Sequence, residues 1–218
     1  MNKIYFNNRL FKDPLDSSKF ELNIYGENNT FYLNDYVGPG KIVINMYGSN
    51  NVFKLGKNNT IRNMLVIDFW ETSTVSPKNV EITIGDENFF NGANIHFISP
   101  LEKSLTIGNG NLFAGDISIW GRNDHIIYDN KTKTRINKDQ DIIIGNSNWI
   151  CQNVTILSGA EIKDFSVVAL GSIVNKKYTK SNVLIAGIPA KVKRKGINWS
   201  IATSMDKIDF ENNIKVKE

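Results

Sequence analysis

The apolar residues in the C-terminal half of this chain recur every six positions. Six aliphatic β-branched residues keep this spacing without a slip: Ile144, Ile150, Ile156, Ile162, Val168 and Val174. An α-helix repeats every 3.6 residues and a half-buried strand every two, so neither element fits. The period fits a chain that runs straight, turns a corner and runs straight again, with one branched side chain pointing inward from each side. Three sides make a coil of about 18 residues, and such coils must stack because none buries its apolar side alone.

The same spacing appears upstream in shorter runs, which predicts that the solenoid begins well before residue 144. These runs are Leu55, Ile61 and Ile67; Ile84 and Phe90; and Ile107, Phe113 and Ile119. A corner motif, Gly-x-x-Asn-x-[Phe/Ile], begins at residues 26, 48, 56, 85, 108 and 145. Asparagine, at thirty of 218 residues, tolerates left-handed backbone geometry and bonds to its own neighbouring backbone. Repeated corners therefore account for the excess of asparagine.

This pattern predicts one elongated domain over residues 21–194, with a loop near 126–141 where the spacing fails. Residues 1–20 are expected to form an N-terminal cap that covers the first coil. Residues 195–218 are expected to form a C-terminal extension that is helical, because apolar residues there alternate with charges. The apolar residues of that extension are Trp199, Ile201, Met205, Ile208 and Phe210.

Composition and charge exclude several classes of function. The net charge is +4 and the basic residues are scattered, so no nucleic-acid partner is expected. The sequence has no apolar run of 18 residues and no signal peptide, which predicts a cytoplasmic protein without a membrane span. The single cysteine, Cys151, excludes an intramolecular disulfide framework and favours a reducing compartment.

Two histidines are the main candidates for chemistry. His125 stands six residues after Ile119, where the register expects the next inward residue, and it precedes a polar stretch. Histidine is the side chain best suited to accept a proton near neutral pH. His96 falls on an outward position and is expected to be structural. Cys151 has no histidine near it in sequence, and no Gly-x-Ser-x-Gly elbow is present, so neither an acyl-cysteine route nor a serine hydrolase is favoured.

The hexad register and a closing motif together resemble a known family. The segment Ala186-Gly187-Ile188-Pro189-Ala190-Lys191 resembles the A-G-x-P-A-K signature that ends the domain of hexapeptide-repeat acyltransferases. The likeness is dense over about residues 107–194. It implies an all-β fold, a left-handed parallel β-helix (a hexapeptide-repeat solenoid). The left hand comes from the resemblance alone, since parallel crossovers are generally right-handed.

Two further segments resemble the capsular polysialic acid O-acetyltransferases within that family. WGRNDHIIYD (120–129) is similar to their segment with the catalytic histidine, and RINKDQDIIIGNSNW (135–149) to the segment that leads to a tryptophan. The resemblance implies an acetyl-CoA-dependent O-acetyltransferase that modifies a hydroxyl of a bacterial surface glycan by direct transfer. His125 would be the general base and Trp149 an oxyanion donor. Asp124 and Tyr128 are expected to contact the acceptor sugar.

The resemblance also assigns the donor site and the assembly. Acetyl-CoA would lie along the C-terminal coils, its phosphates near the cations after Pro189, and no metal is expected to be required. The positions carried over are Trp149, Gln152, Leu170, Gly171, Asn175, Lys176, Lys191 and Arg194. The family implies a homotrimer with active sites between subunits. Two alternatives stay open: an N-acetyltransferase that acts on an amino-sugar nucleotide, and a non-catalytic solenoid that serves as a binding module.

Overall fold

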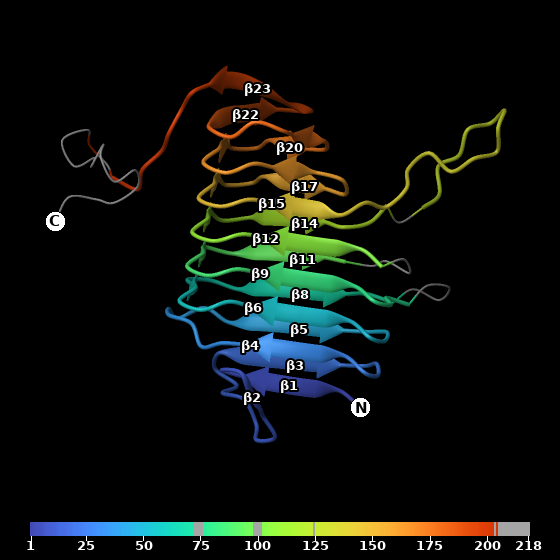
Figure 1. Cartoon of the computed structure of the whole chain (residues 1–218), viewed down its shortest axis with the longest axis vertical. Coiled ribbons are helices and arrows are strands. Elements are labelled where there is room, and N and C mark those ends of the chain that lie inside the picture. The colour runs from blue at the N-terminus through green and yellow to red at the C-terminus, as the bar shows by residue number, and fades with distance from the viewer. Residues whose placement is uncertain (72–75, 98–101, 124, 203, 205–218) are drawn as a thin grey trace.

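A computed structural model describes residues 1–71, 76–97, 102–123, 125–202 and 204. Within these residues the chain contains strands and turns but no helix, and it winds into a parallel β-helix with three flat faces (Figure 1). From β6 (Val52–Leu55) to β22 (Val183–Gly187) the chain gives successive strands to face I, face II and face III in turn, whereas the coils before β6 give strands to faces I and III alone. No helix in the described part of the chain is long and apolar enough to cross a membrane.

Each face is one sheet, and the strands of each are as follows. Face I contains β1 (Lys3–Phe6), β2 (Arg9–Leu10), β4 (Thr30–Leu33), β6 (Val52–Leu55), β9 (Glu81–Ile84), β12 (Ser104–Ile107), β15 (Ile142–Ile144), β18 (Glu161–Ile162) and β21 (Lys177–Tyr178). Face II contains β7 (Thr60–Ile61), β10 (Phe89–Phe90), β13 (Leu112–Phe113), β16 (Trp149–Ile150), β19 (Val167–Val168), β22 (Val183–Gly187) and β23 (Ala190–Lys195). Face III contains β3 (Phe20–Ile24), β5 (Ile42–Met46), β8 (Leu65–Phe69), β11 (Ala93–His96), β14 (Ile117–Trp120), β17 (Thr155–Leu157) and β20 (Ile173–Val174).

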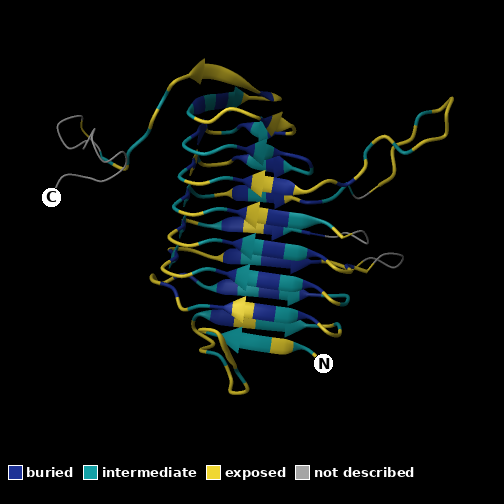
Figure 2. Cartoon of the chain, viewed as in Figure 1, coloured by how far each residue is buried: buried dark blue, intermediate teal, exposed yellow. Residues whose placement is uncertain are grey.

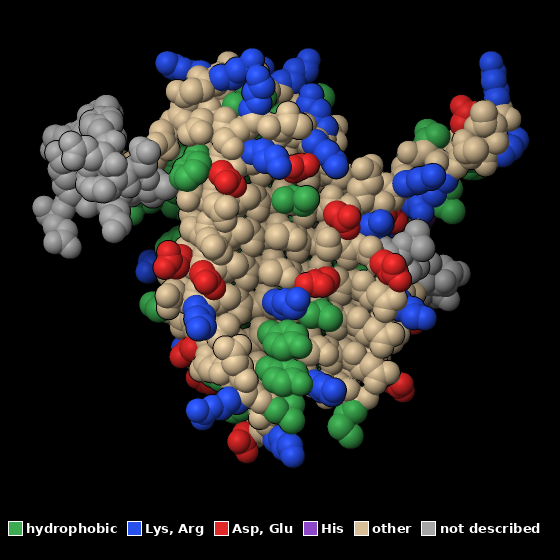
Figure 3. Space-filling model, in the orientation of Figure 1, with side chains coloured by type: hydrophobic (Ala, Val, Ile, Leu, Met, Phe, Trp, Pro, Cys, Tyr) green, Lys and Arg blue, Asp and Glu red, His purple; other side chains and the backbone are tan. Residues whose placement is uncertain are grey.

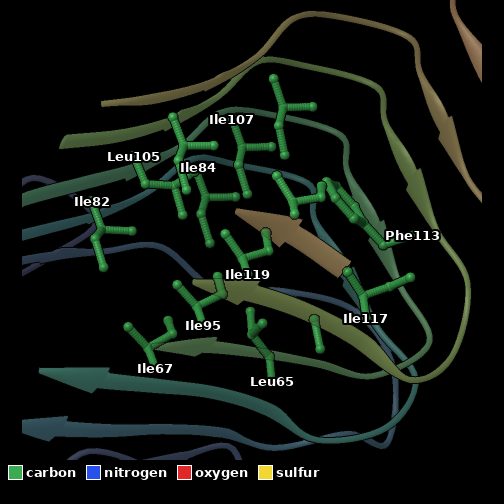
Figure 4. Close-up of a cluster of buried hydrophobic side chains, with 14 of the residues drawn as sticks. Leu65, Ile67, Ile82, Ile84, Ile95, Leu105, Ile107, Phe113, Ile117 and Ile119 are labelled. Atoms are coloured by element: carbon green, nitrogen blue, oxygen red, sulfur yellow. The ribbon is translucent and has the colours of Figure 1, made fainter. Parts of the chain in front are cut away.

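The hexad residues form the core, as the sequence predicts. All six members of the run from Ile144 to Val174 are at most 1% exposed. Parallel pairing places each above its equivalent in the coil below, for example Ile144 above Ile107 on face I and Ile156 above Ile119 on face III. Figure 4 shows the equivalent residues of earlier coils, among them Ile84, Ile107 and Ile119, pointing into the interior of the prism. Figure 2 shows buried residues alternating with less buried ones along the strands.

Buried asparagines join the coils at the corner between faces I and II. The Oδ1 atom of each accepts a hydrogen bond from the backbone N–H of the equivalent residue in the next coil. These bonds run from Asn88 N to Asn59, from Asn111 N to Asn88, from Asn148 N to Asn111 and from Ser166 N to Asn148, at 2.8–2.9 Å. They supply acceptors to N–H groups that the sheets leave unpaired at the corner. An apolar side chain at the same position would leave these buried N–H groups without a hydrogen bond.

The six copies of the corner motif do not all turn the same corner. Asn29 and Asn51 lie between faces III and I, where Asn29 Oδ1 accepts from Asn51 N at 2.8 Å. The other four copies lie between faces I and II. The third motif position is left-handed in several copies, with φ of 56° at Asn58 and 60° at Glu87. Gly26, at the first motif position, has no room for a side chain, because a Cβ there would overlap the carbonyl oxygen of Gly48.

Both ends of the helix are closed by short additions. Strand β1 pairs in parallel with β4, and β2 turns back along β1 at the edge of face I. The Phe6 ring lies 5.5 Å from that of Phe11 and 6.0 Å from that of Phe20, between centroids. At the other end β23 runs antiparallel to β22, so the stack of parallel strands stops there.

The C-terminal extension differs from the prediction. Residues 196–202 contain no helix, so the helical assignment is wrong for this part, and residues 205–218 lie outside the described residues. The segment is instead fixed by two hydrogen bonds to Asn182, one with its backbone and one with its side chain: Ile197 N donates to Asn182 O at 3.0 Å, and Asn182 Nδ2 donates to Ile197 O at 3.2 Å. These contacts hold the chain extended, which the apolar pattern of residues 199–210 does not reveal.

The corner asparagines give a direct test of the fold. Asn111→Ala should lower the free energy of unfolding by about 1–3 kcal/mol, because the buried N–H of Asn148 loses its acceptor. Asn109 is a matched control: its Oδ1 accepts from Asp86 N at 2.8 Å at the same corner, but its side chain is exposed. Water can replace that acceptor, so Asn109→Ala should cost less than about 0.5 kcal/mol. Urea unfolding measures both, and equal losses would contradict the role of the buried asparagines.

Candidate active site

His125 lies on an excursion between β14 and β15, at the corner of faces III and I. Its side chain is exposed, so the prediction that it continues the inward hexad is wrong. The register stops at Ile119 and resumes at Ile142, because the chain makes a long excursion between β14 and β15. We call residues 125–141 the arm; Figure 1 shows it projecting far from the coils. Asp124, predicted to contact the acceptor, lies outside the described residues.

The arm is a hairpin held by its own polar side chains. Its two sides pair through Ile136 N to Ile127 O at 2.8 Å, and Asn137 Nδ2 donates to the carbonyl of His125 at 2.6 Å. At the tip, hydrogen bonds from Thr132 and Lys131 lower the pKa of Asp129. The arm is therefore ordered by local bonds. Four large apolar side chains on it are nevertheless exposed: Ile126, Ile127, Tyr128 and Ile136.

Trp149 lies on face II, where its side chain points outward and the residue is 37% exposed. Trp199, from the C-terminal segment, packs against it with 6.1 Å between ring centroids. The indole Nε1 of Trp199 donates to the carbonyl of Ser147 at 2.7 Å, which fixes this contact. No hydrogen-bond acceptor for Nε1 of Trp149 is found among the described residues. The sequence pattern assigns Trp199 to a helix and gives no sign of this pairing.

The predicted donor residues fall into two groups in a single chain. Gln152, Leu170 and Gly171 turn the corner from face II to face III in successive coils, and Gly171 N donates to Gln152 O at 3.1 Å. Leu170 is exposed and the space around Gly171 is open. Asn175 and Lys176 turn the next corner, from face III to face I. The structure therefore brings the first three together with Trp149 on one side, and the other two elsewhere.

Cations concentrate at the C-terminal end of the helix, around β22 and β23, as Figure 3 shows. A depression of about 400 Å³ there is lined by five lysines, Lys176, Lys177, Lys180, Lys191 and Lys195, together with Tyr178 and its neighbours. Lys191 is thus one of its walls, and Arg194 lies on the same strand. This concentration of charge can hold phosphates, since lysine donates hydrogen bonds to them as a point charge.

Cys151 is poorly suited to act as a nucleophile. The residue is partly buried, and burial raises the pKa of its thiol more than the backbone hydrogen bond of Leu170 lowers it. A raised pKa disfavours the thiolate, which is the reactive form. In the described part of the chain, no three His, Cys, Asp or Glu side chains gather in a way that would hold a metal ion.

His125 and Trp149 do not share a face of one chain. The arm leaves the corner of faces III and I, whereas Trp149 and the segment that covers it lie on face II. Figure 1 shows the arm and the C-terminal segment leaving on opposite sides of the helix. Within one chain, therefore, the predicted base and the predicted oxyanion donor are apart.

Comparisons with known proteins match both the sequence and the fold. No protein-family model matches the sequence. A polysialic acid O-acetyltransferase from Escherichia coli O1:K1 is 30% identical over 126 residues, which is 58% of this chain and 40% of the relative. The crystal structure of the polySia specific acetyltransferase NeuO superposes with a TM-score of 0.67 at 24% identity, covering 94% of this chain and 78% of NeuO.

A second solved structure agrees. The polysialic acid O-acetyltransferase OatWY superposes with a TM-score of 0.61 at 23% identity, covering 84% of this chain and 93% of OatWY. The predicted fold class, an all-β left-handed parallel β-helix, is thereby confirmed. The chain spans only 40% of the length of the E. coli relative. In sequence and in fold, the chain is similar to polysialic acid O-acetyltransferases, as its motifs predict.

Proposed function

We propose that this protein is an acetyl-CoA-dependent O-acetyltransferase that modifies a hydroxyl of a bacterial surface glycan containing sialic acid. The observation that carries the proposal is the 30% identity over 126 residues to a polysialic acid O-acetyltransferase, on a fold that NeuO and OatWY share. The exposed His125, the open indole N–H of Trp149 and the cationic C-terminal end supply the groups that such a reaction needs.

The chemistry is a direct acyl transfer. An imidazole nitrogen of His125 removes the proton from the sugar hydroxyl, and the resulting alkoxide oxygen attacks the thioester carbonyl carbon. The C–O bond forms, the carbonyl oxygen becomes an oxyanion, and the C–S bond then breaks as the carbonyl re-forms. The imidazolium returns its proton to the departing thiolate, so charge and atoms balance. The raised pKa of Cys151 supports a mechanism without an acyl-enzyme.

The oxyanion needs a donor that is already in place before the reaction. Nε1 of Trp149 has no acceptor among the described residues, and the ring is fixed against Trp199 with 6.1 Å between centroids. A preorganised donor of this kind stabilises a tetrahedral intermediate by about 3–4 kcal/mol. Trp199 therefore serves the proposed site as a positioning residue for Trp149.

Two copies of the chain are needed to bring these groups together. The arm exposes Ile126, Ile127, Tyr128 and Ile136. Its base is bonded to the coils, where Gln140 N donates to Ser158 Oγ and Ser104 N donates to Asp141 Oδ1. The exposed apolar surface further out is suited to pack on another molecule. A neighbour placed beside the helix would present its face II to this arm, which would join His125 of one copy with Trp149 of the next. A closed ring of three such contacts is the homotrimer that we propose. Tyr128, two residues before the arm turns, would then contact the acceptor.

The residues present are suited to acetyl-CoA. Gln152 and Gly171 present backbone groups in successive coils beside open space, and Lys191 with Arg194 lies at the cationic end. Asn175 and Lys176 turn the corner from face III to face I, and Lys176 lines the same cationic depression as Lys191, where it can also hold a phosphate. When bound, acetyl-CoA supplies the activated acyl group; the chain's own part is to hold the phosphates with cations and to hold the thioester near His125.

Replacement of the base tests the chemistry. His125→Ala should lower kcat by a factor of about 10² to 10⁴, because proton removal from the hydroxyl is lost. The thermal midpoint should stay at the parental value, because the side chain is exposed on the arm. The measurement is the release of CoA from acetyl-CoA with oligosialic acid as acceptor. A variant with parental turnover would remove His125 from the mechanism.

Replacement of the cations tests the donor site. Lys191→Ala combined with Arg194→Ala should raise the KM for acetyl-CoA by about tenfold, since about 1.4 kcal/mol of phosphate binding is lost, while kcat changes little. The matched control is Lys78→Ala, which removes a cation from a distant coil and should leave both constants unchanged. If the double variant keeps the parental KM, the phosphates bind elsewhere.

A further inference from the structure

A polar and aromatic cluster lies on the outer surface of face III, in the coils below the arm. Parallel register aligns Asn45 with Asp68, Asp68 with His96, and His96 with Trp120, each one coil further along the helix. Trp70 lies two residues after Asp68. Its side chain is hydrogen-bonded to Asp68 and half exposed, so it lies on the same outer surface. None of these residues belongs to the active site proposed above.

The carboxylate of Asp68 is the centre of this cluster. It is almost fully buried, and it accepts hydrogen bonds from Asn45 Nδ2 at 2.6 Å and from Trp70, while its Oδ2 lies 3.1 Å from His96 Nδ1. Burial alone would raise the pKa of Asp68, but the hydrogen bonds from His96, Asn45 and Trp70 outweigh it and lower the pKa. The carboxylate therefore stays ionised, and its lone pairs are used to fix its three neighbours.

The orientation of His96 follows from this contact. A carboxylate only accepts hydrogen bonds, so Nδ1 of His96 carries a proton, and in the neutral ring Nε2 is left as an acceptor. The imidazole ring packs on Trp120 with 4.4 Å between centroids. Trp120 is itself fixed, because its Nε1 donates to Ser118 Oγ at 2.7 Å. His96 thus presents a hydrogen-bonding atom from a position that two neighbours hold.

Two indoles of the cluster remain accessible: Trp120, which packs on the imidazole, and Trp70, which stacks on Tyr47 with 6.3 Å between centroids. Trp70 is 50% exposed and Trp120 is 36% exposed. They lie two coils apart, about 10 Å at the usual strand spacing. A stretch of aromatic carbon beside a fixed acceptor suits a sugar ring, whose C–H faces pack on indoles and whose hydroxyls donate hydrogen bonds. The carboxylate of Asp68 is buried and its oxygens are occupied by hydrogen bonds within the cluster, so the surface offered to a ligand is aromatic and polar, which suits hydroxyls.

We propose that Trp70 and His96, which Asp68 fixes, form together with Trp120 a subsite that binds a sugar ring of the acceptor glycan. Its position connects it to the reaction, because Trp120 ends β14 and the chain then leads directly to His125 and the arm. The glycan would extend from this subsite toward the arm, with the reacting hydroxyl at His125. The assignment of the ligand as the acceptor rests on the proposed function; the binding of sugar by the cluster does not.

The test measures binding directly, with the full chain and oligosialic acid as the probe. Trp70→Ala, His96→Gln and Trp120→Ala should each weaken the dissociation constant from calorimetry by about fivefold or more, and should raise the KM for oligosialic acid but not for acetyl-CoA. The matched control is Tyr32→Ala, which removes a 39% exposed ring on face I that stacks on Tyr5; its constants should equal those of the parent. Thermal midpoints identify any variant that has lost its fold, and the half-exposed Trp70 is the substitution least subject to that risk.

Three results would overturn the subsite. The first is a parental dissociation constant in Trp70→Ala and His96→Gln. The second is a change in oligomeric mass in Trp70→Ala or Trp120→Ala, which would make this surface a contact between copies. The third is a parent chain that does not bind oligosialic acid at all. Failure of the proposed function is separate: the parent would then bind the glycan but release no CoA, and the subsite would still stand if the variants lose binding.

Discussion

The stacking of one coil on the next depends on satisfying the backbone at each corner. Inside the flat faces the parallel sheets do this, but at the corners N–H groups turn inward where water does not reach. The buried asparagines supply the missing acceptor, each through Oδ1 to the next coil, from Asn59 to Ser166. The bond forms only when the asparagine side chain reaches the N–H of the equivalent residue in the next coil. It therefore favours one register between coils, in which the β-branched hexad residues stack in columns.

This construction leaves the outer surface free for function. Inward positions are committed to packing and corner positions to hydrogen bonds, so chemistry can occupy only outward side chains and excursions between strands. His125 is on an excursion, Trp149 is outward on face II, and His96 is outward on face III. A narrow prism cannot place groups from different faces beside one another. An active site that needs both His125 and Trp149 therefore follows from placing two prisms side by side, which is why we assign catalysis to the contact between copies.

The sequence predicts the repeated features well and the single features poorly. The hexads and the corner motif specify the coil because each copy repeats the same physical requirement. His125 was expected to point inward because the count from Ile119 ignores where the chain leaves the helix. The helical expectation for residues 196–202 failed because hydrogen bonds of Ile197 with the backbone and side chain of Asn182 override a weak apolar pattern. The Asp68–His96 contact joins coils whose excursions differ in length, so no fixed spacing in the sequence indicates it.

The most direct measurement is complementation between two defective chains. His125→Ala and Trp149→Ala would each be inactive alone, and chains with different tags would be co-expressed and purified as mixed assemblies. If each active site takes His125 from one copy and Trp149 from its neighbour, a random mixture contains intact sites at about one quarter of positions, and CoA release should recover to about that fraction of the parental rate. If both residues act within one chain, every chain in the mixture is defective. A mixture as inactive as either variant would contradict the account.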